Sequence, residues 1–276
     1  MTTPSNYYRP QTLDDAILKA QLPNSITLAG GALTFGTVTV PYDHVIDIQD
    51  LDDLRRIAIK DELLLIGGAV TLQMLVDDDN PPQVLRQSIT RTLPPNIRNG
   101  ASVGESLVTS TPLPEWLAAL SALGTTVNHI SDGQAQTLPI MQFIEAVHHG
   151  DYHGFVTQIE VNLPSAKSAL GASFVSRTPA DRSIINAAAF VTVDDQNTVK
   201  TATVVIGGAS TAPLIEIELS NLIGNPLDEQ NIQHTTTPLS ALVSPVADYK
   251  GSIEYRREMA SVCGKRALLD CMEQLS

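Results

Sequence analysis

Two glycine-bearing loops hold the residues that are best placed to bind a ligand. The first runs from Leu28 to Gly36 and reads LAGGALTFG, and the second runs from Ser102 to Ser106 and reads SVGES. Each follows an apolar or strand-like stretch, and glycine lets backbone N–H groups turn inward and approach an anion closely. Neither loop has the G-x-G-x-x-G pattern or a P-loop, so Rossmann and NTPase sites are not indicated. By themselves the loops predict either an anion cradle or a tight turn after a strand.

The histidine and cysteine side chains do not indicate a metal site, a disulfide or a catalytic site. His148, His149 and His153 form a cluster, but no ligand at a matching spacing accompanies them, so we expect an exposed loop and no metal site. Cys263 and Cys271 lie roughly 12 Å apart along one expected helix, too far for a disulfide. Without a C-x-x-C pair, the chain is not expected to bind an iron–sulfur cluster or structural zinc. No catalytic nucleophile is indicated, so any redox chemistry requires an organic cofactor.

The overall charge narrows the range of partners. The chain has 276 residues and a formal net charge of −13, and an acidic chain repels nucleic acid and anionic membrane surfaces. No segment approaches about 18 consecutive apolar residues, so no membrane span is expected. The N-terminal MTTPSNYYRP lacks a basic region followed by an apolar stretch, and we therefore expect a cytoplasmic protein.

Hydrophobic periodicity predicts an α+β fold with antiparallel or mixed sheets, because no regular βαβ alternation occurs. The expected helices cover residues 13–19, 50–57, 72–76, 83–90, 115–123 and 252–275. The expected strands cover residues 25–28, 37–40, 44–48, 63–66, 125–130, 154–163, 183–193 and 198–206, the last two forming a hairpin. The small and polar stretch 167–171 marks a domain boundary. In the last helix, Tyr255-Arg256-Arg257 is interpreted as a docking surface or as pairing with Glu254 and Glu258.

The order of sequence blocks resembles the FAD-binding subunit of molybdenum hydroxylases, the xanthine and carbon monoxide dehydrogenase flavoproteins. The segment 96–104, NIRNGASVG, is its most specific part and is similar to the family's second FAD loop. The first glycine loop is similar to the family's A-G-G-T-D-L loop. The other similar blocks are YRPxTLDDA at 8–16, IGGAVTL at 66–72, 117–127, Arg177-x-x-x-Asp181, Gly207-Gly208 and Tyr255-Arg256-Arg257.

The resemblance implies a two-subdomain, PCMH-like FAD-binding domain followed by a C-terminal α+β domain with an antiparallel sheet and helices. The expected domains are subdomain 1 at 1–57, subdomain 2 at 58–166 and the C-terminal flavoprotein domain at 170–276. The amides of the first loop would hold the FAD pyrophosphate, and the second loop would be another cradle. The expected FAD-binding residues are Leu28, Ala29, Gly30, Gly31, Ala32, Leu33, Gly36, Ser102, Val103, Gly104, Glu105, Ser106, Glu115 and Ile159.

Both loops depart from the family's pattern. Ala32 and Leu33 replace a Thr-Asp pair, and Glu105 and Ser106 replace the second glycine and the following Asn or Asp. Val175 stands where some members have a lysine near the cofactor. A carboxylate facing the phosphates could cost about 1 kcal/mol or more, although backbone contacts leave side chains free to point away.

The resemblance implies a flavoprotein electron-transfer subunit of an oxidoreductase complex. FAD would accept electrons from the clusters of a 2Fe-2S small subunit, after oxidation of the substrate at the molybdenum cofactor of a large subunit. The acceptor would be NAD+, a quinone or oxygen. One alternative is a degenerate, non-flavin structural subunit of the same complex, motivated by Ala32, Leu33 and Glu105. Another is a stand-alone flavin oxidoreductase, which the similar C-terminal blocks disfavour.

Overall fold

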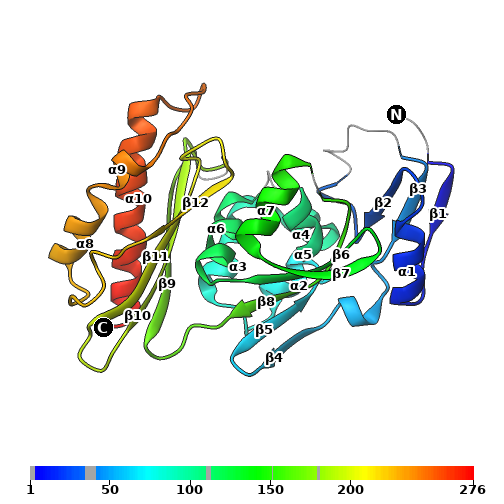
Figure 1. The fold of residues 1–276 in the computed structure, drawn as a ribbon, viewed down its shortest axis with the longest axis horizontal. Coiled ribbons are helices and arrows are strands. Elements are labelled where there is room, and N and C mark those ends of the chain that lie inside the picture. Colours follow the sequence, from blue (N-terminus) through cyan, green and yellow to red (C-terminus); the bar gives the residue numbers. More distant parts are fainter. Residues whose placement is uncertain (1–3, 35–41, 110–112, 151, 179–180) are drawn as a thin grey trace. The chain divides into compact units, whose positions relative to one another are not determined.

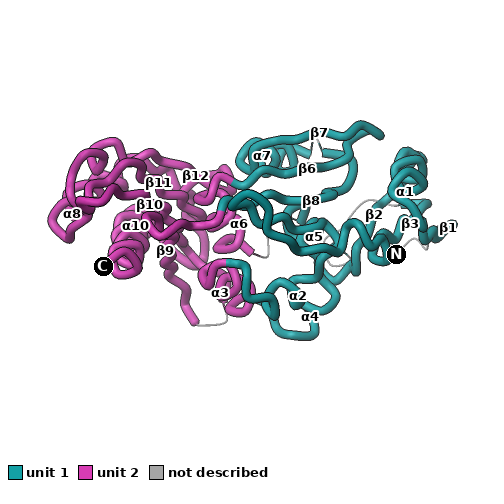
Figure 2. Tube along the Cα trace, turned by 90° about the horizontal axis from the view of Figure 1, so that it is seen from below, with its two compact units in different colours: residues 1–81, 93–112, 125–162 teal, residues 82–92, 113–124, 163–276 magenta. Residues whose placement is uncertain are grey.

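The computed structural model describes residues 4–34, 42–109, 113–150, 152–178 and 181–276. Its contacts divide the chain into two compact units that are not continuous in sequence (Figure 2). Unit 1 contains Met1–Pro81, Leu93–Pro112 and Thr125–Asn162, and unit 2 contains Pro82–Thr92, Leu113–Gly124 and Leu163–Ser276. The three expected domains remain a prediction. The expected strand at 37–40 and Gly36 lie outside the described residues.

A small parallel sheet opens unit 1, in the order β1 (Asn6–Tyr8), β3 (His44–Asp47) and β2 (Ser25–Leu28). Helix α1 (Leu13–Ala20) begins at Thr12, whose side chain accepts the Asp15 N–H at 3.2 Å. Its buried Ala16 belongs to the same apolar core as Ile46 of β3. The predicted first helix and the strand 25–28 are therefore confirmed.

The larger sheet of unit 1 is antiparallel throughout, with β8 in its centre. Its order is β4 (Ile57–Lys60), β5 (Leu63–Gly67), β8 (Gly154–Asn162), β6 (Thr126–Ser131) and β7 (Gln134–Pro139). The helices of this unit that follow α1 are α2 (Leu72–Asp77), α4 (Pro95–Gly100), α5 (Val103–Val108) and α7 (Ile140–His149). The predicted helix at 72–76 is confirmed as α2, which begins at Thr71, whose side chain accepts the Met74 N–H at 3.1 Å.

Three local predictions in unit 1 are wrong. Residues 50–57 form only a 3-10 turn, η1 (Asp52–Leu54), because β4 already begins at Ile57 and pairs with β5. Residues 102–106, expected to form a glycine loop, lie at the start of helix α5. His148 and His149 end helix α7 instead of lying in a loop, and Gly150, at φ 79°, stops that helix. The described residues contain no group of three or more side chains that could hold a metal ion.

Unit 2 is built on a four-stranded antiparallel sheet in the order β12 (Leu214–Glu218), β11 (Val199–Gly207), β10 (Ile185–Val193) and β9 (Ser168–Val175). The predicted hairpin of β10 and β11 is confirmed. The long helix α10 (Ile253–Gln274) covers one face of this sheet and α6 (Pro114–Ala122) covers the other (Figure 1). The remaining helices are α3 (Gln83–Thr92), α8 (Glu229–Thr236) and α9 (Leu239–Leu242).

One sequence interpretation in unit 2 is corrected by the structure. The stretch 167–171, where a domain boundary is expected, includes the start of β9, which pairs with β10 along its length. Arg256 is buried and is not a docking residue: its guanidinium donates to the Ile184 carbonyl at 2.8 Å and to Asp248 Oδ1 at 2.7 Å. It therefore anchors the start of α10 to the sheet. Among the described residues, no helix is both long and apolar enough to cross a membrane.

Candidate functional site

The two glycine loops meet in unit 1. Gly30 adopts φ 106°, a conformation that favours glycine, and a Cβ there would lie 2.3 Å from the Gly100 carbonyl oxygen. That same oxygen accepts the Ala32 N–H at 3.0 Å. The first loop is thus held against the end of α4, immediately before the second loop.

The second loop also packs against the end of β5. The Gly104 N–H donates to the Gly68 carbonyl at 2.9 Å, and the Val103 N–H donates to the Val70 carbonyl at 2.9 Å. A Cβ on Gly104 would approach the Gly68 oxygen to 2.9 Å, so a larger residue would push the segments apart. Three segments that are distant in sequence are therefore fixed side by side.

The second loop is the start of a helix. Ser102 Oγ accepts the Glu105 N–H at 3.1 Å, and the Glu105 carboxylate in turn accepts the Ser102 N–H at 3.4 Å. This reciprocal arrangement is a capping box, whose signature S-x-x-E is present in the sequence. The S-x-x-E spacing is the signal that predicts this helix start, within a segment interpreted above as a glycine loop.

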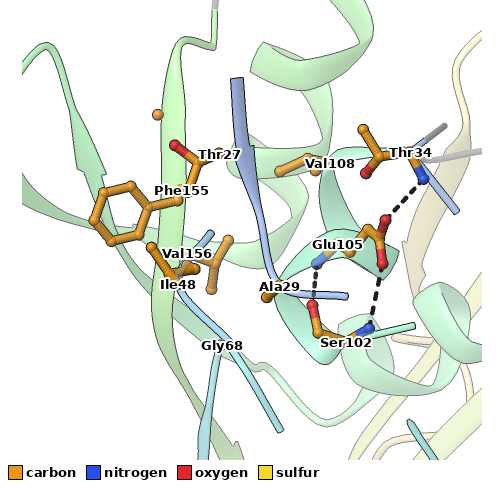
Figure 3. A pocket seen from close by; sticks show the side chains of 12 residues that line it. Thr27, Ala29, Thr34, Ile48, Gly68, Ser102, Glu105, Val108, Phe155 and Val156 are labelled. Atoms are coloured by element: carbon orange, nitrogen blue, oxygen red, sulfur yellow. Dashed lines mark hydrogen bonds between the residues drawn. The ribbon is translucent and has the colours of Figure 1, made fainter. Parts of the chain in front are cut away.

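The Glu105 carboxylate reaches from α5 to the first loop. Its Oε1 accepts the Leu33 N–H at 3.1 Å and the Thr34 N–H at 2.7 Å, as Figure 3 shows for Thr34. Burial raises the pKa of this carboxyl, while hydrogen bonds from the hydroxyl and amide of Thr34 and from the amides of Ser102 and Leu33 lower it. We call the N–H groups of Leu33 and Thr34 the amide cradle.

A small cavity adjoins this contact (Figure 3). Its volume is about 30 Å³, which is enough for a water molecule or two and far too small for a dinucleotide. The polar residues in its wall include Thr34, Ser102 and Glu105, and Gly68, Gly104 and Val156 contribute to the rest. The arrangement can hold an anion through backbone N–H groups, and in this structure the anion is Glu105.

The other predicted residues of unit 1 lie in or near these loops, with one exception. Leu28 ends β2 and Ala29 lines the small cavity. Ser106 is buried, and its hydroxyl donates to the Val103 carbonyl at 2.7 Å. Ile159 lies instead within β8, where its backbone stands between β5 and β6, and it is not part of the cavity wall.

Glu115 belongs to unit 2, in the first turn of α6. Its buried carboxylate forms an ion pair with the partly buried Arg91 of α3, and its second oxygen, Oε2, has no hydrogen-bond partner within the described ranges. The Arg91 guanidinium also stacks on Phe174, 3.5 Å from the ring centroid. No sequence pattern connects Arg91 with a carboxylate 24 residues away, so this pair is not predictable from the sequence.

A larger cavity opens beside Arg91 in the same unit. Its volume is about 420 Å³, and its wall includes Phe174, Val175 and Arg177. Val175 is the position at which the family resemblance implies a lysine in some members. The charged and aromatic groups in this wall are the guanidinium groups of Arg91 and Arg177 and the ring of Phe174.

Comparisons with known proteins cover almost the whole chain. Residues 3–165 match the family described as the FAD binding domain in molybdopterin dehydrogenase, and residues 173–271 match the CO dehydrogenase flavoprotein C-terminal domain. The carbon monoxide dehydrogenase medium chain of Afipia carboxidovorans is 24% identical, over 95% of each chain. The xanthine dehydrogenase FAD-binding subunit of Escherichia coli O157:H7 is also 24% identical, over 97% of this chain and 96% of the relative.

Solved structures share the fold at lower identity. A chain of carbon monoxide dehydrogenase from Hydrogenophaga pseudoflava superposes with a TM-score of 0.83 at 18% identity, covering 100% of both chains. A chain of quinoline 2-oxidoreductase from Pseudomonas putida 86 gives a TM-score of 0.83 at 17% identity, covering 99% and 98%. The predicted fold class is confirmed. The chain belongs to the family of FAD-binding flavoprotein subunits of the molybdopterin dehydrogenases.

Proposed function

We propose that this chain is the FAD-binding electron-transfer subunit of a molybdenum hydroxylase complex. The observation that carries the proposal is the match of both family domains, in the same order, over nearly the full chain. Bound FAD would supply the redox chemistry by accepting electrons and passing them on. The protein would bind and orient the cofactor, so no acid–base pair is required of it.

The amide cradle fits one part of FAD. It already binds a carboxylate through two consecutive N–H groups, and the same donors suit a phosphate oxygen of the FAD pyrophosphate. The fit is conditional, because the Glu105 carboxylate and a phosphate oxygen would use the same donors. The contacts that we predict for Glu115 and Ile159 belong to this proposal as well.

The electrons would have to come from a partner. The only two cysteines, Cys263 and Cys271, are buried in α10 and cannot hold a cluster. We infer a 2Fe-2S small subunit as the donor, a large subunit with the molybdenum cofactor as the place of substrate oxidation, and NAD+, a quinone or oxygen as the final acceptor. We also propose that the protein is cytoplasmic, in line with the expectation from its sequence.

Glu105 gives a second candidate function some weight. If its carboxylate never leaves the amide cradle, the chain would be a structural subunit that holds the complex together without flavin. The fold and the subunit contacts would then be kept while the cofactor was lost.

Flavin content separates the two candidates. The complex would be purified from the native host and scanned for visible flavin absorbance, and FAD would be quantified after denaturation. We expect FAD in stoichiometric amount with this chain. A complex that contains the molybdenum and iron–sulfur subunits but no flavin would refute the electron-transfer function and leave the structural one.

A further inference from the structure

The amide cradle and Glu105 form a bound pair within a single chain. Leu33 and Thr34 direct consecutive N–H groups at one carboxylate oxygen, which is the geometry with which backbone nests hold anions. Both N–H groups and the carboxylate are buried. The ligand comes from a segment about 70 residues further along the chain, so only the tertiary fold delivers it.

The distances indicate that the amide cradle is the main partner of Glu105. The Thr34 N–H lies 2.7 Å from Oε1, a short, charge-assisted contact, and the Leu33 N–H lies 3.1 Å from it. The contact that Glu105 makes with its own helix cap, from the Ser102 N–H to Oε2, is longer at 3.4 Å. A glutamate that served only as a helix cap would not bond to the N–H groups of Leu33 and Thr34 in the first loop.

A phosphate group cannot join this arrangement as it stands. The adjoining cavity of about 30 Å³ has no room for it, and the donors nearest the cavity are already used. Two anions on the same pair of N–H groups would also repel each other strongly in a buried site. Either the carboxylate or the phosphate occupies the cradle.

We propose that Glu105 is a tethered competitor for FAD: its carboxylate occupies the amide cradle, and a phosphate of FAD binds there only when this side chain has withdrawn. This inference rests on the proposed function. It makes Glu105 the residue that sets the affinity of the chain for its cofactor.

Equilibrium binding of FAD to the full chain, alone and in its complex, tests this inference. E105A frees the amide cradle and is expected to bind FAD at least tenfold more tightly than the unmodified chain. E105Q keeps the size of the side chain but removes the charge that repels an incoming phosphate, so its affinity should fall between the two. Inorganic pyrophosphate, titrated into the same proteins, should follow the same order.

The matched control is D228A. Asp228 caps α8 through the Asn231 N–H at 2.8 Å, so its loss removes a carboxylate helix cap in unit 2 and leaves the amide cradle intact. D228A should bind FAD like the unmodified chain, and thermal melting would check that each variant is folded. If E105A does not fold, E105Q decides the question.

The outcomes distinguish this inference from the proposed function. Equal FAD affinity in the unmodified chain, E105Q and E105A would overturn the role of Glu105 while leaving FAD binding established. Absence of FAD binding in every variant, even within the complex, would overturn both. Tighter binding of FAD by D228A as well would assign the effect to loss of a helix cap and also overturn the inference.

Discussion

Glu105 in unit 1 and Glu115 in unit 2 are buried almost equally, with 6% and 7% of their surfaces exposed, but they are held in different ways. Backbone N–H groups hold Glu105, whereas the Arg91 guanidinium holds Glu115. A backbone N–H group can donate to different anions, so one anion can replace another at the amide cradle. A guanidinium carries a full charge, so removing its partner leaves a buried ion uncompensated. The contact of Glu105 is therefore suited to replacement by another anion, whereas the pair of Glu115 with Arg91 is suited to a permanent structural role.

The largest effect should come from breaking the permanent pair. R91A leaves the Glu115 carboxylate buried without its cation and should lower the free energy of unfolding by about 3–5 kcal/mol, measured by urea denaturation. The control is R177A, because the pair of Arg177 with Asp181 is largely exposed and should cost less than about 1 kcal/mol. Equal losses in the two variants would show that the burial of the Arg91 pair has no energetic consequence.

The next effect concerns the backbone that forms the amide cradle. G30A adds a Cβ at φ 106° that would meet the Gly100 carbonyl oxygen, and it should cost about 2–4 kcal/mol. Gly150 has a similar positive φ of 79° but open space around it, so G150A should cost only about 1–2 kcal/mol. The difference between the two losses, measured by thermal or urea unfolding, gives the energetic effect of the close approach between Gly30 and Gly100. A G150A variant as unstable as G30A would contradict this effect.

Removal of the exchangeable anion should cost less. E105A takes away the acceptor of the Leu33 and Thr34 N–H groups and half of a capping box, for an expected loss of about 1–3 kcal/mol in the free energy of unfolding. The loss should be smaller than that of R91A, since water can reach freed amides in an opened loop. A loss in E105A as large as that in R91A would remove the distinction between the two glutamates.

The smallest effect is a dependence of stability on pH. Burial raises the pKa of Glu105 in the folded chain above its ordinary value of 4.5, so the folded state binds this proton more tightly than the unfolded state. The stabilisation from this group is complete below pH 4.5 and is lost as the pH rises through the raised pKa. The neutral amide side chain that E105Q introduces does not titrate. The unmodified chain should therefore lose stability relative to E105Q across this window, and a constant difference would contradict the prediction.

Local patterns predicted those parts of the fold that depend on neighbours in sequence. Helix α1 has a capping threonine, and the hairpin of β10 and β11 has a polar turn between two apolar runs. Strand β9 escaped prediction because its small residues do not resemble a strand. They allow α10 to pack closely, since a Cβ at Gly171 would lie 2.1 Å from the Ala267 carbonyl oxygen. The stretch expected to mark a domain boundary thus includes the start of a strand whose small side chains leave room for a helix.

The sequence predicted which loops form the candidate site, but it did not predict the hydrogen bonds between them. The sequence placed Leu33 and Glu105 in the two FAD loops and identified Glu105 as the departure most harmful to phosphate binding. It did not indicate that the carboxylate bonds to the first loop, because that depends on where α5 lies against residues about 70 positions earlier. The partnership of Arg91 with Glu115 was hidden for the same reason.

Helices α3 and α6 lie in the sequence of unit 1 but pack in unit 2, and this has a consequence for biosynthesis. Helix α6 leaves the ribosome before any strand of the sheet that it covers, the first of which begins at Ser168. Its Trp116 and Leu117, fully covered in the finished protein, are exposed to solvent for several seconds at ordinary translation rates. The nascent chain therefore displays an apolar segment too short to be a stable helix by itself, and unit 2 cannot be completed before its last strands emerge.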